Sequence, residues 1–144
     1  MRPFLLVVVL LTALLVPAYA HHSFYTFYYM DKTMEIEGVV KSVKIVNPHS
    51  EMTVEVTDKD GTTALWRITA TAGGIVGLQK IGWKAGMLVG TRVKIEGHPP
   101  RKEGGTGLAG GKVTLLEKAS LPDGKEYPSG TILWLGGGGG IPIG

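Results

Sequence analysis

The sequence predicts a small all-β domain that contains one short helix. Apolar and polar residues alternate with a period of two over several short segments, most clearly from Met52 to Thr57. This is the period of a half-buried strand. Turn-forming residues such as Asp60 and Gly61 separate these segments. The chain has 144 residues and no cysteine, so we expect one core that is stabilised by packing and not by disulfides.

The first three strands are predicted to form a meander. The first begins at Thr33, and its apolar residues change phase at Gly38, which predicts a β-bulge there. The turn Asn47-Pro48-His49 leads into the strand that ends at Thr57. After the next turn, Thr62 to Thr69 forms the returning strand.

The second half of the domain is predicted to add a helix and two strands. Ile75, Val76, Leu78 and Gln79 are at helical spacing within a segment that runs from Ala72 to Gly82. Two more strands follow, Leu88 to Gly97 and Lys112 to Lys118, with a Pro/Gly-rich loop from His98 to Gly111 between them. This order is that of the five-stranded Greek-key barrel known as the OB-fold. A small open sandwich is the alternative architecture.

The amino-terminal residues have the pattern of an export signal. Arg2 is followed by an apolar run from Phe4 to Val16, by Pro17, and by the small residues Ala18 and Ala20. This pattern predicts cleavage after Ala20, and the run is shorter than the roughly 20 residues that span a bilayer. We therefore expect a periplasmic or secreted bacterial protein without membrane contact after cleavage. A retained membrane anchor is the alternative.

The composition predicts how the rest of the chain is divided. We expect a signal peptide at 1–20, an aromatic arm at 21–32, an OB-like barrel at 33–127 and a flexible Gly-rich tail at 128–144. The arm holds five aromatic residues within Phe24 to Tyr29, a density that predicts packing against the domain. Within the tail, local packing of Ile132, Leu133 and Trp134 is the alternative to flexibility.

The charges are mixed along the chain. There are 15 Lys and Arg residues against 12 Asp and Glu residues, a formal net charge of +3. Because the basic residues are interspersed with the acidic ones, we expect no nucleic-acid partner. Arg101 and Lys102 form either a small anion site or a solvated pair.

The histidines give the sharpest hypothesis about function. Cleavage after Ala20 would place His21 at the new amino terminus, followed by His22. A terminal histidine can bind a metal through its amine and its ring nitrogen, and His49 would add a second imidazole to make a nitrogen site of the kind that Cu(II) favours. In the alternative, His49 only fixes its turn by a hydrogen bond. Cleavage one residue later would remove the chelate of His21, and we expect His98 to be solvated.

Three classes of function remain open. No serine-hydrolase elbow, phosphate loop, dinucleotide fingerprint or zinc-protease motif is present, so we expect no enzyme. The leading hypothesis is an exported barrel that binds copper or another late transition metal through His21, His22 and His49. The alternative is a periplasmic protein-interaction domain that uses the aromatic arm and no metal. A metal-dependent oxidase or hydrolase with the same histidines ranks last, since it would need an open coordination position and a substrate cleft.

Five short motifs give the chain a family resemblance. They are His21-His22-Ser23-Phe24, Glu37-Gly38-Val39-Val40, Asn47-Pro48-His49, Gly82-Trp83 and Leu121-Pro122-Asp123-Gly124. In this order they resemble the small exported bacterial proteins grouped as domain of unknown function 6152, over residues 21 to about 125. The resemblance implies an exported β-domain and no particular activity. The chain departs from the family pattern at Tyr25 to Tyr29, where small residues and an acid are usual, and in the glycine-rich helix segment and tail.

Overall fold

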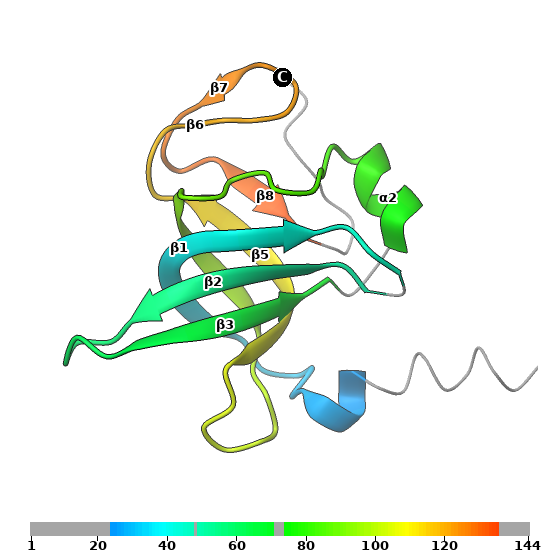
Figure 1. Ribbon diagram of the computed structural model, residues 1–144. Coiled ribbons are helices and arrows are strands. Elements are labelled where there is room, and N and C mark those ends of the chain that lie inside the picture. The colour runs from blue at the N-terminus through cyan, green and yellow to red at the C-terminus, as the bar shows by residue number, and fades with distance from the viewer. Residues whose placement is uncertain (1–23, 48, 71–73, 136–144) are drawn as a thin grey trace, which may run out of the picture.

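The computed structural model describes residues 24–47, 49–70 and 74–135 (Figure 1). A helical turn at 24–27 comes first. The elements that follow are β1 (Met34–Lys44), β2 (Glu51–Thr57), β3 (Thr63–Thr69), α2 (Gly74–Lys80), β4 (Arg92–His98), β5 (Gly107–Leu115), β6 (Ala119–Ser120), β7 (Glu126–Tyr127) and β8 (Ile132–Trp134). The predicted all-β class with little helix is confirmed.

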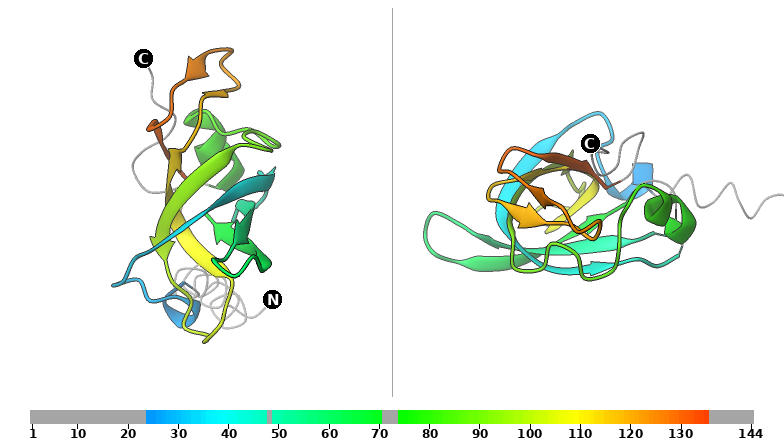
Figure 2. Two further views of the ribbon diagram at one scale, coloured as in Figure 1. Left: turned by 90° about the vertical axis from the view of Figure 1, so that its left-hand side faces the viewer. Right: turned by 90° about the horizontal axis from the view of Figure 1, so that it is seen from above.

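Five of the strands close into a barrel. The strand order is β3-β2-β1-β4-β5, and a parallel pairing of Arg67–Thr69 with Gly107–Ala109 joins β3 to β5. The long strand β1 belongs to both halves, because its first part pairs with β4 and its second part pairs with β2. In Figure 2, the view from above shows the strands wrapped around one interior. This topology is that of the predicted OB-fold barrel.

The bulge in β1 lies further along the strand than predicted. The pairing with β2 shifts register between Val40 and Ser42 and not at Gly38. Gly38 has a different role, since a Cβ atom there would clash with the carbonyl oxygen of Glu55 on β2. Gly38 therefore lies next to the point where β1 passes from one partner strand to the other, where the backbones approach closely.

The last two barrel strands also begin at other residues than predicted. β4 begins at Arg92 and not at Leu88, because Leu88 and Gly90 have φ angles of 64° and 86°, which belong to turns and not to strands. β5 begins at Gly107, within the predicted loop, because its first residues pair with β3 to close the barrel. Neither the turn before β4 nor the pairing of β5 with β3 is visible in a local sequence pattern.

Helix α2 ends at Lys80, and Gly82 forms its cap, as predicted. The φ angle of Gly82 is 94°, and the backbone N–H groups of Gly82 and Trp83 donate to the carbonyls of Gln79 and Leu78. These two bonds form a Schellman cap. The cap turns the chain so that Trp83 lies fully buried, with its indole Nε1 donating to the carbonyl of Trp134 at 2.7 Å.

The domain extends beyond the predicted limit at residue 127. Leu133 and Leu135 are fully buried, while Ile132 and Trp134, which alternate with them, are exposed. This alternation is that of a strand with one face on the core, and β8 pairs with β5 accordingly. Before β8, the short hairpin β6–β7 encloses the turn Leu121-Pro122-Asp123-Gly124. Residues 136–144, the rest of the predicted tail, lie outside the described residues.

Candidate functional site

The predicted metal ligands fall on two segments. His49 is described, and it lies in the loop between β1 and β2, which we call loop 1–2 (residues 45–50). His21 and His22 lie outside the described residues. The first described residue, Phe24, belongs to the aromatic arm, whose described part (residues 24–32) lies below the barrel in Figure 1. The loop between β4 and β5, loop 4–5 (residues 99–106), is next to this arm.

Loop 1–2 is closed by a buried serine. Ser50 has only 1% of its surface exposed. Its Oγ accepts a hydrogen bond from the backbone N–H of Val46 at 3.0 Å and donates to the carbonyl of Val46 at 3.1 Å. One hydroxyl thus satisfies both backbone groups of Val46, and the loop is held across its base.

Asn47 fixes the same loop to helix α2. Its Oδ1 accepts a hydrogen bond from the backbone N–H of Ile75 at 3.0 Å. Ile75 is in the first turn of α2, where backbone N–H groups have no partner within the helix. Asn47 therefore caps a helix that is distant in sequence, and His49 lies between two fixed residues.

The His49 ring lies against the aromatic arm. The centroids of the Phe24 and His49 rings are 4.8 Å apart, with an interplanar angle of 71°, which is an edge contact. His49 is half-buried. Within the described part of the chain, no hydrogen bond engages its ring nitrogens. His49 thus has no hydrogen-bond partner among these residues with which it could fix its own turn, which was the predicted alternative. Ser50 fixes the turn instead.

The aromatic arm is tied to loop 4–5 by backbone hydrogen bonds. The N–H of Tyr29 donates to the carbonyl of Pro99 at 2.9 Å, and the N–H of Arg101 donates to the carbonyl of Phe27 at 2.8 Å. Tyr28 and Pro100 form an antiparallel bridge between them. The arm packs against the domain, as expected, but it does so as an added strand-like segment and not by burying all of its rings.

The side chain of Arg101 strengthens this attachment. Its Nε donates to the carbonyl of Tyr25 at 2.8 Å, and its guanidinium carbon is 4.6 Å from the centroid of the Tyr29 ring. The Lys32 Nζ lies 4.4 Å from the centroid of the same ring. These are cation–π distances. Arg101 thus contacts the arm. The sequence predicted either an anion site or a solvated pair for Arg101 and Lys102, and neither prediction included this contact.

His98 is engaged elsewhere. Its Nδ1 is 2.8 Å from the carbonyl oxygen of Lys32. A carbonyl only accepts hydrogen bonds, so Nδ1 carries the proton. His98 was expected to be solvated, whereas it is half-buried and holds the end of the arm to β4.

The outer face of β2 and β3, where OB-fold proteins often bind oligonucleotides, carries several charged side chains and one exposed apolar residue, Leu65. Glu51 forms ion pairs with Lys44 and Arg67, and Glu55 forms one with Lys41. The aromatic residue of β3, Trp66, is paired with Val54 and packs against the core. Over the described strands, this face therefore lacks the stacking aromatic rings that single-stranded nucleic acids require.

The described residues hold no ready-made metal site. No group of three or more His, Asp or Glu residues comes together in the ranges 24–47, 49–70 and 74–135. In the same ranges no helix has the length and apolar character to cross a membrane. A site of three or more such ligands that includes His49 would therefore contain residues outside these ranges.

Comparison with known proteins gives one result. Residues 9–109 match the Family of unknown function (DUF6152), and this chain is a member of that family. The matched span includes the aromatic arm, loop 1–2 and loop 4–5, and it ends before the turn Leu121-Pro122-Asp123-Gly124. Searches of curated proteins and of solved structures found no significant match.

Three residues that shape this region were not predicted from the sequence. Ser50 and Asn47 hold loop 1–2, and Arg101 holds the arm. A serine that follows a turn and precedes a strand is a weak signal for a local hydrogen bond. For Asn47 and Arg101 the partners are 28 and 76 residues away, so no local pattern indicates them.

Proposed function

We propose that this protein is an exported, non-enzymatic OB-type barrel that binds a late transition metal, Cu(II) above all. The ligands in this proposal are His49, the amine and ring of His21 at the mature amino terminus, and His22 as a neighbouring donor. The single observation that supports it most is the contact between the rings of Phe24 and His49. This contact fixes the start of the described arm at loop 1–2.

The covalent chain limits how far the proposed ligands lie from His49. His21 precedes Phe24 by three residues, and three residues span at most about 10 Å. Since Phe24 touches His49, the amine and imidazole of His21 are within reach of the His49 ring. Two imidazoles and an amine are three nitrogen donors, a set that suits Cu(II).

The state of His49 agrees with a ligand role. Its loop is held on both sides by Asn47 and Ser50, so the ring needs little rearrangement. No described residue uses its nitrogens for a hydrogen bond. A ligand that is already oriented binds a metal with a smaller entropic cost.

Electron paramagnetic resonance with an equimolar amount of Cu(II) tests the proposal on protein purified after export. We expect a stoichiometric signal whose nitrogen couplings change in His49→Ala and stay the same in His98→Ala. His98 is the matched control, because it is also half-buried but is occupied by the Lys32 carbonyl. The same spectrum in wild type and His49→Ala would contradict the proposal.

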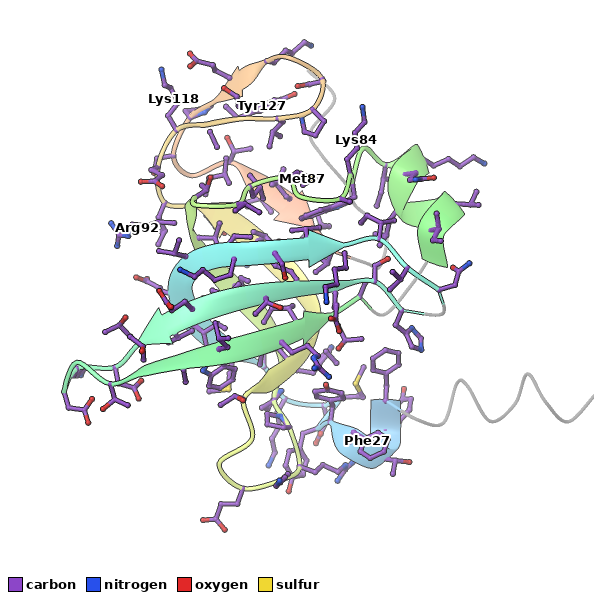
Figure 3. All side chains as sticks on the ribbon, in the orientation of Figure 1. Phe27, Lys84, Met87, Arg92, Lys118 and Tyr127 are labelled. Atoms are coloured by element: carbon purple, nitrogen blue, oxygen red, sulfur yellow. The ribbon has the colours of Figure 1, made fainter. Side chains whose placement is uncertain are left out.

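The exposed rings of the arm favour a second candidate function, docking of a periplasmic protein partner. Tyr25 and Phe27 are 64% and 62% exposed, and the labelled Phe27 lies on the helical turn below the barrel in Figure 3. Aromatic side chains in such positions are typical anchors of protein interfaces. The test is the mass in solution, by light scattering, of wild type and of the Tyr25→Ser, Phe27→Ser double variant. An assembly of wild type that dissociates in the variant supports docking of the arm to a second copy of this chain. Monomers in both proteins exclude this self-association.

A further inference from the structure

We propose that the aromatic arm and loop 4–5 together form a docking surface for an acidic segment of a partner protein. This surface, which we call the arm surface, consists of Tyr25, Phe27, Tyr29, Lys32, Arg101 and Lys102. The proposal rests on the second candidate function, docking through the arm, and names the chemistry of the partner. It involves no metal, and all six residues lie within the described ranges.

Two exposed rings and a guanidinium lie next to each other on the arm surface. Tyr25 and Phe27 are 64% and 62% exposed. Arg101 is bonded to both residues, because its Nε donates to the carbonyl of Tyr25 and its backbone N–H donates to the carbonyl of Phe27. Figures 1 and 2 show the arm and loop 4–5 side by side at one end of the barrel. Aromatic residues and arginine are the residue types that protein interfaces enrich.

The cations of the arm surface differ from most cations of the barrel strands. Five of the six cations on β1 to β5 form ion pairs with glutamates, namely Lys41, Lys44, Arg67, Lys94 and Lys112. Within the described part of the chain, Lys32, Arg101 and Lys102 are exposed and form no ion pair. Two carboxylates adjoin these cations in the chain, Asp31 and Glu103, and in the same ranges neither of them forms an ion pair. Three positive charges are thus open to the carboxylate of a partner.

Two of these cations lie close to one ring. The Lys32 Nζ is 4.4 Å and the Arg101 guanidinium carbon is 4.6 Å from the centroid of the Tyr29 ring. The two charges are therefore separated by at most the sum of these distances, about 9 Å, which is within the Debye length of roughly 10 Å at 0.1 M salt. Like charges at this separation repel each other. Because a carboxylate between them would relieve the repulsion, the arrangement favours an anionic group over a neutral one.

The guanidinium of Arg101 has donors left for such a group. An arginine has N–H donors on Nε and on both terminal nitrogens, and only Nε bonds to an acceptor among the described residues. The terminal nitrogens of an arginine can bind both oxygens of one carboxylate. We therefore expect an aspartate or glutamate of the partner at Arg101 and an apolar neighbour of that residue against Tyr25 or Phe27.

A protein segment fits the arm surface better than a membrane does. Basic clusters that recognise anionic lipids commonly have about four to eight Lys and Arg residues, whereas the arm surface has three. Many helices that lie on membranes have about 20 to 30 residues, whereas residues 24–27 form a single turn. Arginine clusters that bind acidic motifs are, in contrast, a common mode of peptide recognition.

NMR titration of the exported protein with a short synthetic peptide tests the proposal. The probe has blocked ends and two glutamates that flank a phenylalanine, and the comparison peptide has glutamines in place of the glutamates. We expect the acidic peptide to shift the amides of residues 25–29 and of Arg101 and Lys102. The glutamine peptide should bind roughly 5-fold more weakly or worse, since each exposed ion pair is modest. Added salt should weaken the acidic peptide alone.

Charge reversal at Lys102 tests the surface itself. Lys102 is a better position than Arg101, because Arg101 also holds the arm. We expect Lys102→Glu to weaken the acidic peptide roughly 5-fold and to leave the glutamine peptide unchanged. Lys59→Glu is the matched control, an exposed lysine in the turn between β2 and β3, and should bind both peptides as wild type does. In the Tyr25→Ser, Phe27→Ser variant both peptides should bind more weakly.

The failure of each claim has its own signature. Equal binding of the two peptides, with shifts of the arm amides, would overturn the acidic partner and leave docking through the arm in place. If neither peptide shifts the arm amides and wild type is a monomer, docking through the arm fails as well. Stronger shifts of the same amides by inorganic phosphate, or by vesicles of phosphatidylglycerol, would overturn the proposal in favour of a small anion or a membrane.

Discussion

The barrel and the aromatic arm are held together by different forces. The barrel has a continuous apolar core, in which Trp83, Met52 and Leu133 are fully buried. The arm has exposed rings and is attached by backbone hydrogen bonds and by the cations Lys32 and Arg101 around Tyr29. Burial contributes far more free energy per residue than exposed polar contacts do. The difference suggests that stability belongs to the barrel, whereas the proposed binding chemistry depends on how the arm meets loop 1–2.

The largest expected effect is in the core of the barrel. Trp83→Ala removes a fully buried ring and leaves the Trp134 carbonyl without its 2.7 Å hydrogen bond. We expect the free energy of unfolding to fall by about 3 to 5 kcal/mol. Urea denaturation followed by circular dichroism measures it. A loss below about 1 kcal/mol would mean that the core is not organised around this residue.

The next effect concerns the crossing of β1 and β2. In Gly38→Ala the new Cβ would meet the carbonyl of Glu55, so the strands must separate, at an expected cost of about 2 kcal/mol or more. Gly77→Ala is the control, because nothing lies within 4 Å of its Cβ position in α2. Alanine should stabilise that helix by roughly 0.5 to 1 kcal/mol. Two similar results in thermal denaturation would show that the close approach is unimportant.

Loop 1–2 is intermediate between barrel and arm. Ser50→Ala removes both bonds to Val46, and we expect the free energy of unfolding to fall by about 1 to 3 kcal/mol. Chemical denaturation gives the value, and nuclear magnetic resonance should show shifts of the Val46 and His49 amides. Unchanged spectra of these amides would show that the serine does not hold the loop.

The arm should have almost no effect on stability. In the Tyr25→Ser, Phe27→Ser variant little buried surface is lost, so the free energy of unfolding should stay within about 0.5 kcal/mol of wild type. A fall as large as that of Ser50→Ala would break the distinction between barrel and arm. Chemical denaturation of the two variants in parallel decides it.

The last effect is confined to the β6–β7 hairpin, at the opposite end of the molecule from Phe27 (Figure 3). The Tyr127 hydroxyl donates to Asp123 Oδ2 at 2.6 Å, and this bond, with the Lys125 backbone N–H, lowers the pKa of Asp123. A lowered pKa means that the bond stabilises the hairpin above the pKa of the unfolded chain. The stabilisation is lost as pH falls through the folded pKa. Tyr127→Phe should raise the pKa of Asp123 in an NMR titration, and an unchanged pKa would contradict the hydrogen bond.

The strands were predictable wherever one face of a segment is buried. Met52 and Val54 point inward and their neighbours outward, which the period of two shows directly. The cap at Gly82 was equally visible, because it depends on residues within a few positions. The same local patterns did not give the position of the bulge, since a bulge is defined by the register of a partner strand.

The surroundings of His49 were much less predictable. The sequence indicated the loop and its histidine, but the Phe24 contact joins residues that are far apart in the chain. The role of Arg101 likewise depends on where the barrel places loop 4–5. Long-range contacts of exposed side chains follow from the closed fold and leave no periodic trace in the sequence.

The central claim is that the amino-terminal end of the arm and His49 form one site. Paramagnetic broadening by an equimolar amount of Cu(II), in the NMR spectrum of the exported protein, tests it most directly. The claim predicts that the amides of Phe24 to Tyr28 and of loop 1–2 broaden together, while those of the β6–β7 hairpin stay sharp. Broadening of the arm without loop 1–2, or broadening centred on His98, would contradict it.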